Sequence, residues 1–266
     1  MKRRMKRRTK RINHSLPLPL ALLLACLAGG AGAQESGAVT PYRPSVSSPA
    51  QLPAVGQLEF EAGLLSIRDS GARRDSVPLL FKLAFSPQWG VLVGGDAYVA
   101  TRDDAGNPAR GLGDTNVELK RAFLIDSTTA FGLELNAKVP SAKDGIGSGK
   151  ADYTLNTIFS KDIGQVHMDA NANLTRLGAW DAGTSRRQSG LSASFSLDVA
   201  ERWGATAEWS GTRRGGADST AQVLLAGAYS PAKRMTFDFG VAHGLNAASP
   251  DWSLFCGVVV ALGQLW

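Results

Sequence analysis

The chain has 266 residues, of which 44% are hydrophobic and 20% charged, and its formal net charge is +6. Eight of its 29 basic residues lie within residues 1–11, so the rest of the chain holds 21 basic against 23 acidic residues. The high isoelectric point therefore does not indicate a nucleic-acid partner, since such a protein needs its Lys and Arg clustered on the folded part.

Residues 1–33 have the pattern of a secretory signal peptide. A basic start is followed by "LPLPLALLLACLAGG", which is too short and too interrupted to span a bilayer, and then by a small-residue cleavage site that ends at Ala33. The alternative is a lipidated Cys26, because "LLAC" resembles a lipoprotein signal, but apolar sequence continues past it. Without Cys26 only Cys256 remains, so no intramolecular disulfide is expected.

Residues 34–56 are rich in proline and small polar residues. Pro41, Pro44, Pro49 and Pro53 interrupt both helical and strand hydrogen bonding, and no hydrophobic periodicity is present. Two alternatives fit this composition. The segment is either a flexible periplasmic tail or a segment folded into the lumen of a barrel.

From residue 57 to the end, the sequence reads as short strands. Apolar and polar residues alternate over segments of about eight to twelve residues, each closed by Gly, Pro, Asn or Asp, and no helical periodicity is sustained. The expected strands are 57–67, 76–86, 89–100, 114–125, 130–140, 151–160, 165–176, 189–199, 202–211, 220–230, 234–244 and 252–266.

The connections between these strands alternate in length. Tight turns are expected around Pro87, 125–129, 161–164, Glu201 and 230–233, and longer polar loops at 68–75, 101–113, 141–150, 177–188, 211–219 and 244–251. This alternation predicts an all-β, twelve-stranded, up-and-down antiparallel transmembrane β-barrel over residues 57–266, with short periplasmic turns and longer external loops.

Aromatic residues mark both ends of the apolar strand face. At the short-turn ends they are Phe85, Trp89, Phe123, Phe131, Phe159, Trp203, Tyr229 and Trp266, and at the long-loop ends Tyr153, Trp209 and Trp252. Such residues form the girdles of membrane barrels, so the apolar face is expected to contact outer-membrane lipid. Leu135 should face lipid near mid-membrane, and Arg121, on the same face, should reach the headgroups beside Phe123.

The opposite strand face is polar and predicts the lining of the lumen. The lumen-lining candidates are Glu118, Lys120, Glu134, Lys138, His167, Asp169, Asn171, Asp198, Glu208 and Asp238, and Glu59, Glu61, Lys82 and Asp96 share their parity. Two alternatives remain open. An open acidic path would favour cations, whereas a network in which Glu118, Lys120, Glu134 and Lys138 neutralise one another would close the interior.

No catalytic, cofactor-binding or metal-binding pattern stands out. Outer-membrane phospholipases carry a His-Xaa-Ser-Asn-Gly pattern, but His167 is followed by "MDAN". His167 and Asp169 are therefore expected to be polar residues that line the lumen rather than members of a catalytic triad. His243 is expected at the external rim, facing outward. No zinc spacing or phosphate-binding glycine loop before a helix is present.

The C-terminal strand ends in the aromatic Trp266, with Val258, Val260 and Leu262 alternating before it. This pattern is typical of strands that barrel-assembly machinery recognises, and Gln264 departs from it. Cys256 has the same outward parity and is read as a small apolar residue in contact with lipid.

One region resembles a known family. "GLGDTNVELKRAF" followed by "FGLELNAKVPSAKDGIGSGKADYTLN" is similar to the outer-membrane proteins of the phenol-degradation MetA-pathway family, with Gly113, Asp114, Lys120, Pro140, Gly145, Gly147 and Gly149 at matching positions. "PSAKDG" departs from the tighter Thr-Gly turn usual there. The resemblance implies an outer-membrane channel or uptake protein for small solutes, with aromatic and hydrophobic compounds among the candidates. Because no catalytic pattern stands out, an enzyme is not expected. A structural outer-membrane protein with a plugged lumen is the alternative, and a lipid-modifying enzyme the more distant one.

Overall fold

The computed structural model describes residues 37–266, and the expected signal peptide and its cleavage site lie outside this range. Its strands are β1 (Gln57–Asp69), β2 (Ala72–Ala84), β3 (Trp89–Arg102), β4 (Pro108–Gly111), β5 (Thr115–Leu124), β6 (Thr129–Val139), β7 (Asp152–Ile163), β8 (Val166–Arg176), β9 (Arg187–Ala200), β10 (Trp203–Arg214), β11 (Thr220–Ala232), β12 (Met235–Gly244) and β13 (Trp252–Gln264). No helix in this range is long and apolar enough to cross a membrane.

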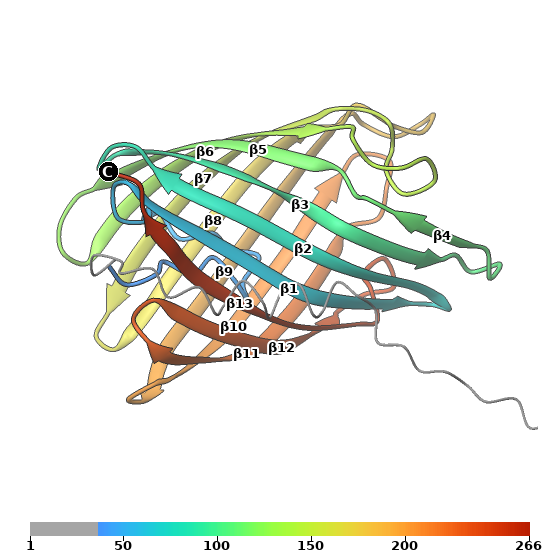
Figure 1. Ribbon diagram of the computed structural model, residues 1–266. Coiled ribbons are helices and arrows are strands. Elements are labelled where there is room, and N and C mark those ends of the chain that lie inside the picture. Colours follow the sequence, from blue (N-terminus) through green and yellow to red (C-terminus); the bar gives the residue numbers. More distant parts are fainter. Residues whose placement is uncertain (1–36) are drawn as a thin grey trace, which may run out of the picture. The chain divides into compact units, whose positions relative to one another are not determined.

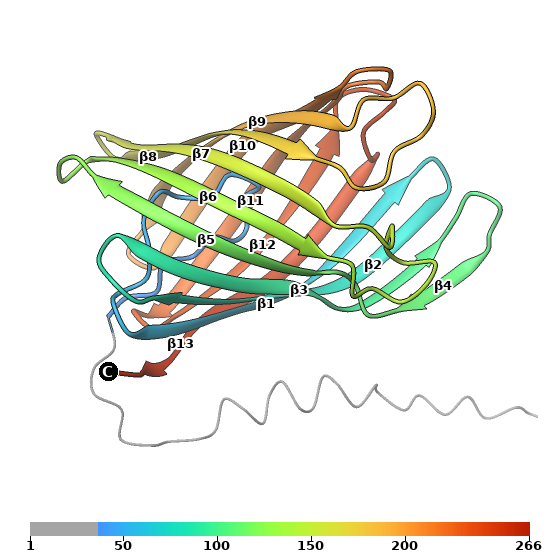
Figure 2. The same ribbon diagram turned by 90° about the horizontal axis from the view of Figure 1, so that it is seen from above.

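Twelve of these strands close into an antiparallel barrel. Each pairs with its neighbours in chain order, β3 pairs directly with β5, and β1 pairs with β13 to complete the ring, for example through Phe60 and Val260. Figure 1 shows the tilted strands from the side and Figure 2 shows them from above. The prediction of a twelve-stranded up-and-down barrel is confirmed.

Two expected external loops are wrong in detail. Residues 68–75 form no long loop, because β1 and β2 continue past the expected ends and meet in a two-residue turn at Ser70 and Gly71, both with positive φ. Such a turn matches the twist of antiparallel strands and allows the ladder to extend. In the stretch 101–113, β4 pairs with the end of β3 and forms a second projecting hairpin, which Figure 1 shows at the end of the barrel away from the C-terminus.

The barrel is polar inside and apolar outside, the reverse of a soluble protein. Its largest fully buried side chains include Lys82, Lys120, Gln57, Glu59 and Glu61. Large apolar side chains are exposed on the outer face, among them Leu133, Leu135, Leu155, Leu174, Phe195, Leu225 and Leu254. A closed barrel satisfies its backbone hydrogen bonds between strands, so an apolar outer face of this kind suits contact with lipid.

Aromatic side chains pair across strands at both ends of this outer face. The ring centroids of Phe131 and Phe159 lie 5.0 Å apart at the short-turn end, and those of His243 and Trp252 lie 4.2 Å apart at the long-loop end. The Arg121 guanidinium lies over the Phe123 ring at 4.5 Å, which is how a cation on the apolar face keeps a favourable partner.

Residues 37–56, here called the lumen segment, contain no strand and lie inside the barrel, as both views show in blue. The segment starts at the short-turn end, where the Val39 amide donates to the Lys233 carbonyl, and returns to that end. The segment ends at a bridge from Val55 to Ala84, and Gly56 then turns the chain into β1 with φ of +78°. A Cβ at Gly56 would lie 2.6 Å from the Gln264 side chain, so the turn needs glycine.

We expect Leu135→Arg to lower the free energy of unfolding in a bilayer by roughly 2 to 4 kcal/mol, because it places a charge on the outer face near mid-membrane. Leu135 is 58% exposed there. Denaturant titration of the refolded protein in lipid vesicles measures the change. Asn173→Arg, on the inner face of β8, is the control and should cost less. Equal costs for both variants would contradict the assigned orientation.

Candidate functional site in the barrel interior

The backbone of the lumen segment is held by side chains of the barrel wall. The Thr40 amide donates to both carboxylate oxygens of Glu59 at 3.1 Å, and the Tyr42 amide donates to Glu61 at 2.8 Å. Further along, the Ser47 amide donates to Glu208 at 2.9 Å. A segment without secondary structure leaves its N–H groups unpaired, so inward carboxylates provide the acceptors that a buried backbone requires.

The same arrangement continues along β8 and β7. The Ser48 amide donates to the Asn171 side chain at 3.0 Å, and Asn171 donates back to the Ser48 carbonyl at 2.9 Å. The Ala50 amide donates to the Ser160 hydroxyl at 2.8 Å. The lumen segment therefore contacts strands around much of the barrel wall.

Two buried lysines join the wall to the lumen segment. Lys82 forms ion pairs with Glu59 at 2.9 Å and Glu61 at 2.6 Å, and it also donates to the Thr40 carbonyl. Lys120 pairs with Glu134 at 3.0 Å and donates to the Pro49 carbonyl. Both lysine side chains are 0% exposed, so their charges depend on these partners.

Tyr42 lies between these two lysines. The Lys82 ammonium is 4.3 Å from the centre of its ring and the Lys120 ammonium 4.1 Å, both within cation–π range. Burial, and then the neighbouring carboxylates led by Glu134, raise the pKa of the Tyr42 phenol above its usual range. The phenol therefore stays protonated and donates to the Gln51 carbonyl at 2.8 Å.

An arginine of the lumen segment binds β12, which is two strands away from β1 in the ring. Arg43 donates from Nε and Nη2 to the two carboxylate oxygens of Asp238, each at 3.1 Å. A bidentate guanidinium–carboxylate pair fixes direction as well as distance. Residues 40–43 are thus held by the four consecutive strands β2, β1, β13 and β12.

The ten predicted lumen residues have different surroundings. Lys120, Glu134, Asp169, Asn171, Glu208 and Asp238 are buried, whereas Glu118, Lys138 and His167 are partly exposed. Asp198 is exposed near the turn between β9 and β10. Its inward parity brings no burial there because the strand pairing is irregular beside Trp203, close to the barrel rim.

The predicted network of Glu118, Lys120, Glu134 and Lys138 is wrong as a single unit. Only Lys120 and Glu134 pair directly. Lys138 pairs instead with Asp152 at 2.6 Å and with Asp114 at 3.5 Å, and Glu118 accepts from Asn136 at 2.8 Å. Lys138 lies four residues beyond Glu134 along β6, toward the long-loop rim, where Asp152 is its Cα partner.

His167 belongs to a hydrogen-bonded chain of side chains. Its Nδ1 lies 2.5 Å from Asp162 and its Nε2 lies 3.2 Å from Asp169, while the Ser160 hydroxyl donates to Asp169. The serine bonds the carboxylate and not the imidazole, so the order of a Ser-His-Asp triad is absent from this cluster. In residues 37–266, no cluster of three or more His, Cys, Asp or Glu side chains is arranged to hold a metal ion.

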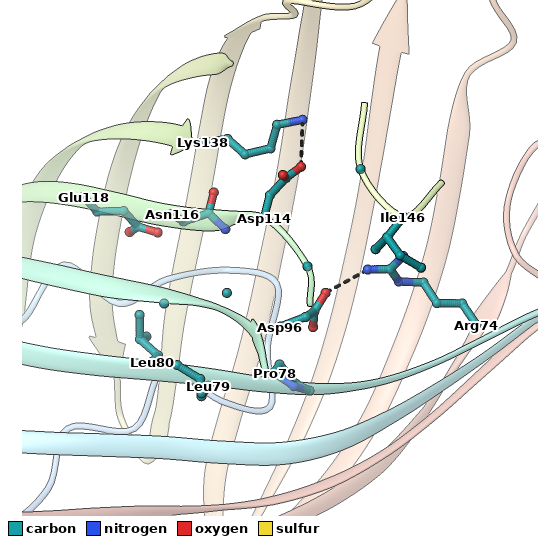
Figure 3. Close-up of a pocket in the computed structure, with 14 residues that line it drawn as sticks. Arg74, Pro78, Leu79, Leu80, Asp96, Asp114, Asn116, Glu118, Lys138 and Ile146 are labelled. Atoms are coloured by element: carbon teal, nitrogen blue, oxygen red, sulfur yellow. Dashed lines mark hydrogen bonds and ion pairs between the residues drawn. The ribbon is translucent and has the colours of Figure 1, made fainter. Parts of the chain in front are cut away.

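Beyond the lumen segment, toward the long-loop end, the wall lines a cavity of about 400 Å³. Figure 3 shows Glu118 and Asn116 beside Leu80 and Pro78, with Asp114 and Lys138 paired above them. Arg74 and Asp96 form a second ion pair at 2.8 Å. Glu118 forms no ion pair within the described residues, so its carboxylate is the charged group available to a solute in this cavity.

Sequence reasoning missed Tyr42, Arg43 and Ser160. Tyr42 and Arg43 lie in a stretch without periodicity, so no parity rule gives their direction. Ser160 is on the inward parity of β7 and could have been found from it. Arg74 and Asp96 became neighbours only because β1 and β2 extend beyond the predicted strand ends.

Comparisons with known proteins agree with the barrel. The profile of the family described as "Putative MetA-pathway of phenol degradation" matches residues 42–262, which includes most of the lumen segment. A search of curated proteins found no match. An outer membrane channel from Pseudomonas putida F1 has a similar structure, with a TM-score of 0.62, 12% identity, and coverage of 84% of this chain and 99% of that one.

Two porins are also similar in fold. The NanC porin has a TM-score of 0.54 at 10% identity and covers 76% of this chain and 98% of its own. The KdgM porin, solved with disordered oligogalacturonate, has a TM-score of 0.50 at 10% identity, with 77% and 98% covered. At these identities the similarity establishes the fold.

We expect Lys120→Met to lower the free energy of unfolding by about 3 to 5 kcal/mol, because it leaves the buried Glu134 without its cation. The double variant Lys120→Met/Glu134→Leu removes both charges and should recover part of that loss. Urea titration of the three proteins in the same micelles gives the comparison. A double variant less stable than the single one would contradict the pairing.

Proposed function

The chain belongs to the phenol-degradation MetA-pathway family, and we propose that it is an outer-membrane channel for small solutes whose passage is closed by its own lumen segment. The observation that carries this proposal is the set of buried hydrogen bonds between residues 40–50 and the wall. Solutes enter from the long-loop end, reach the cavity beside Glu118, and pass only after the lumen segment moves.

The fold of the comparison structures supports a channel, since the P. putida protein is described as an outer membrane channel and the other two proteins as porins. The polar lining of the cavity supports passage of hydrated or amphipathic molecules, because the groups that line a pore determine which solutes pass through it. The cavity combines Pro78, Leu80 and Ile146 with Asn116 and Glu118. This mixture suits a small solute with an apolar body and a polar group, and aromatic compounds fit that description.

The alternative is a structural protein whose lumen is permanently plugged. The hydrogen bonds between the lumen segment and the wall fit this alternative equally well if the segment never leaves its place. The two functions differ in whether the lumen segment leaves its place. The Ser47 hydroxyl donates to the Ser192 hydroxyl at 2.9 Å, which provides a position for a reversible covalent lock.

We expect Ser47→Cys/Ser192→Cys, made with Cys256→Ser, to form a disulfide that keeps the lumen segment on β9, since the two hydroxyls already touch. In planar bilayers the oxidised protein should be silent, and reduction should restore stepwise conductance. The two single-cysteine proteins control for the substitutions. A deletion of residues 38–52 should conduct without a closed state. Silence of the deletion and of the reduced protein at all voltages would favour the structural alternative.

We also expect Glu118→Gln to lower the preference for cations over anions, because this carboxylate faces the cavity without an ion pair. Reversal potentials measured across a KCl gradient, in the deletion background, report the change. Glu201→Gln, in the exposed turn between β9 and β10, is the matched control for one lost charge. An unchanged reversal potential in Glu118→Gln would exclude this residue from the ion path.

A further inference from the structure

A groove of about 420 Å³ runs along the outer face of β6 to β9, near the long-loop end. Two rungs of cross-strand neighbours line it. The deeper rung is apolar and consists of Leu135, Leu155 and Leu174, which are Cα partners in turn. The rung nearer the loops joins Tyr153 to Arg176, and Arg176 to Arg187.

The two arginines of this groove differ from the opposed Arg68 and Arg73, which share the carboxylate of Asp75. Arg176 and Arg187 are directly opposite each other on β8 and β9, both are exposed, and neither forms an ion pair with any residue in the described part of the chain. Arg213 lies one strand further on, opposite Ser189, and is exposed as well. Like charges directly opposite on a sheet are destabilising. An anion bound between them would remove that cost.

The position of the arginines indicates what kind of anion fits. Tyr153, an exposed aromatic residue of the outer face, is the Cα partner of Arg176. Such aromatic residues lie at the level of lipid headgroups, so the guanidinium groups lie there too and the three leucines lie deeper, among the acyl chains. Guanidinium groups bind phosphate in a planar, bidentate manner.

We propose that this groove is a specific site for a lipid with a phosphate headgroup, held by Arg176 and Arg187, with an acyl chain along Leu135, Leu155 and Leu174. The proposal rests on the proposed function only for the placement of the barrel in a membrane, and not on conduction. Charge complementarity selects an anionic headgroup over a neutral one, and the apolar rung selects a lipid over a free anion.

Native mass spectrometry of the refolded protein, released from micelles doped with phosphatidylglycerol or with phosphatidylcholine of the same chains, tests the site. We expect one phosphatidylglycerol to be retained with roughly tenfold preference, as two charge-assisted contacts allow. Arg176→Gln/Arg187→Gln should reduce the preference to near unity. Arg102→Gln/Arg110→Gln, two exposed arginines of the β3–β4 hairpin, removes the same charge elsewhere and should leave the preference intact.

Three results would overturn the proposal. They are equal retention of both lipids by the wild-type protein, equal loss of preference in both double variants, and full competition by inorganic phosphate alone, which would indicate an adventitious ion only. A second readout separates binding from folding. Arg176→Gln should raise the unfolding midpoint in phosphatidylcholine vesicles, where it relieves repulsion, and lower it in phosphatidylglycerol vesicles. Absence of conductance would not change the expected lipid binding. Failure of the protein to insert into either kind of vesicle would contradict the placement of the barrel in a membrane.

Discussion

The rest of the interior depends on one constraint, which is that a proline-rich segment without secondary structure must satisfy its backbone inside a closed barrel. An unpaired buried N–H group costs about 1 to 3 kcal/mol, so a segment placed in the lumen needs acceptors along its whole path. Inward-facing side chains supply them, and the carboxylates of Glu59, Glu61 and Glu208 are the main ones. The wall carboxylates in turn receive donors that offset their desolvation.

This reciprocity changes what an acidic interior means. Counted along the strands, the inward acids outnumber the bases and resemble the wall of a cation channel. In three dimensions most of these carboxylates have a partner. Asp238 forms an ion pair with Arg43, Glu134 forms one with Lys120, and Glu208 accepts hydrogen bonds from backbone amides. The charge pattern is therefore largely that of a binding site for the protein's own segment. Glu118 differs because only an amide donor, from Asn136, reaches it.

The sequence predicts the barrel well because its strand signals are local. A period of two, turn residues and girdle aromatics each depend on a few neighbouring positions, so twelve strands and their inward faces follow directly. Strand ends are harder to predict where polar residues continue the strand pairing into solvent, as at Arg68 and Arg73. Both strand faces are polar there, so apolar and polar residues no longer alternate. The small strand β4 was missed for the same reason.

The contacts of the lumen segment could not be predicted in this way. Ser47 and Glu208 are 161 positions apart, and Arg43 and Asp238 are 195 apart, so each pairing depends on the closed barrel already being in place. Nothing in the local sequence orients Tyr42 between Lys82 and Lys120. Strand alternation predicts which wall residues point into the lumen. The composition of the lumen segment does not decide between a periplasmic tail and a position inside the barrel.

The two ends of the barrel consequently have different physical roles. Near the short-turn end, the lumen segment forms the Arg43–Asp238 ion pair and hydrogen bonds with several strands, so any movement of the segment must break many contacts together rather than one at a time. Near the long-loop end, the wall lines a cavity in which Glu118 has a hydrogen bond but no ion pair, and the outer face carries Arg176 and Arg187. These three charged groups form no ion pair within residues 37–266 and lie at the long-loop end, whereas the charged wall residues that hold the lumen segment are paired. In the channel that we propose, this separation lets ligand binding at one end vary without disturbing the contacts that hold the other end shut.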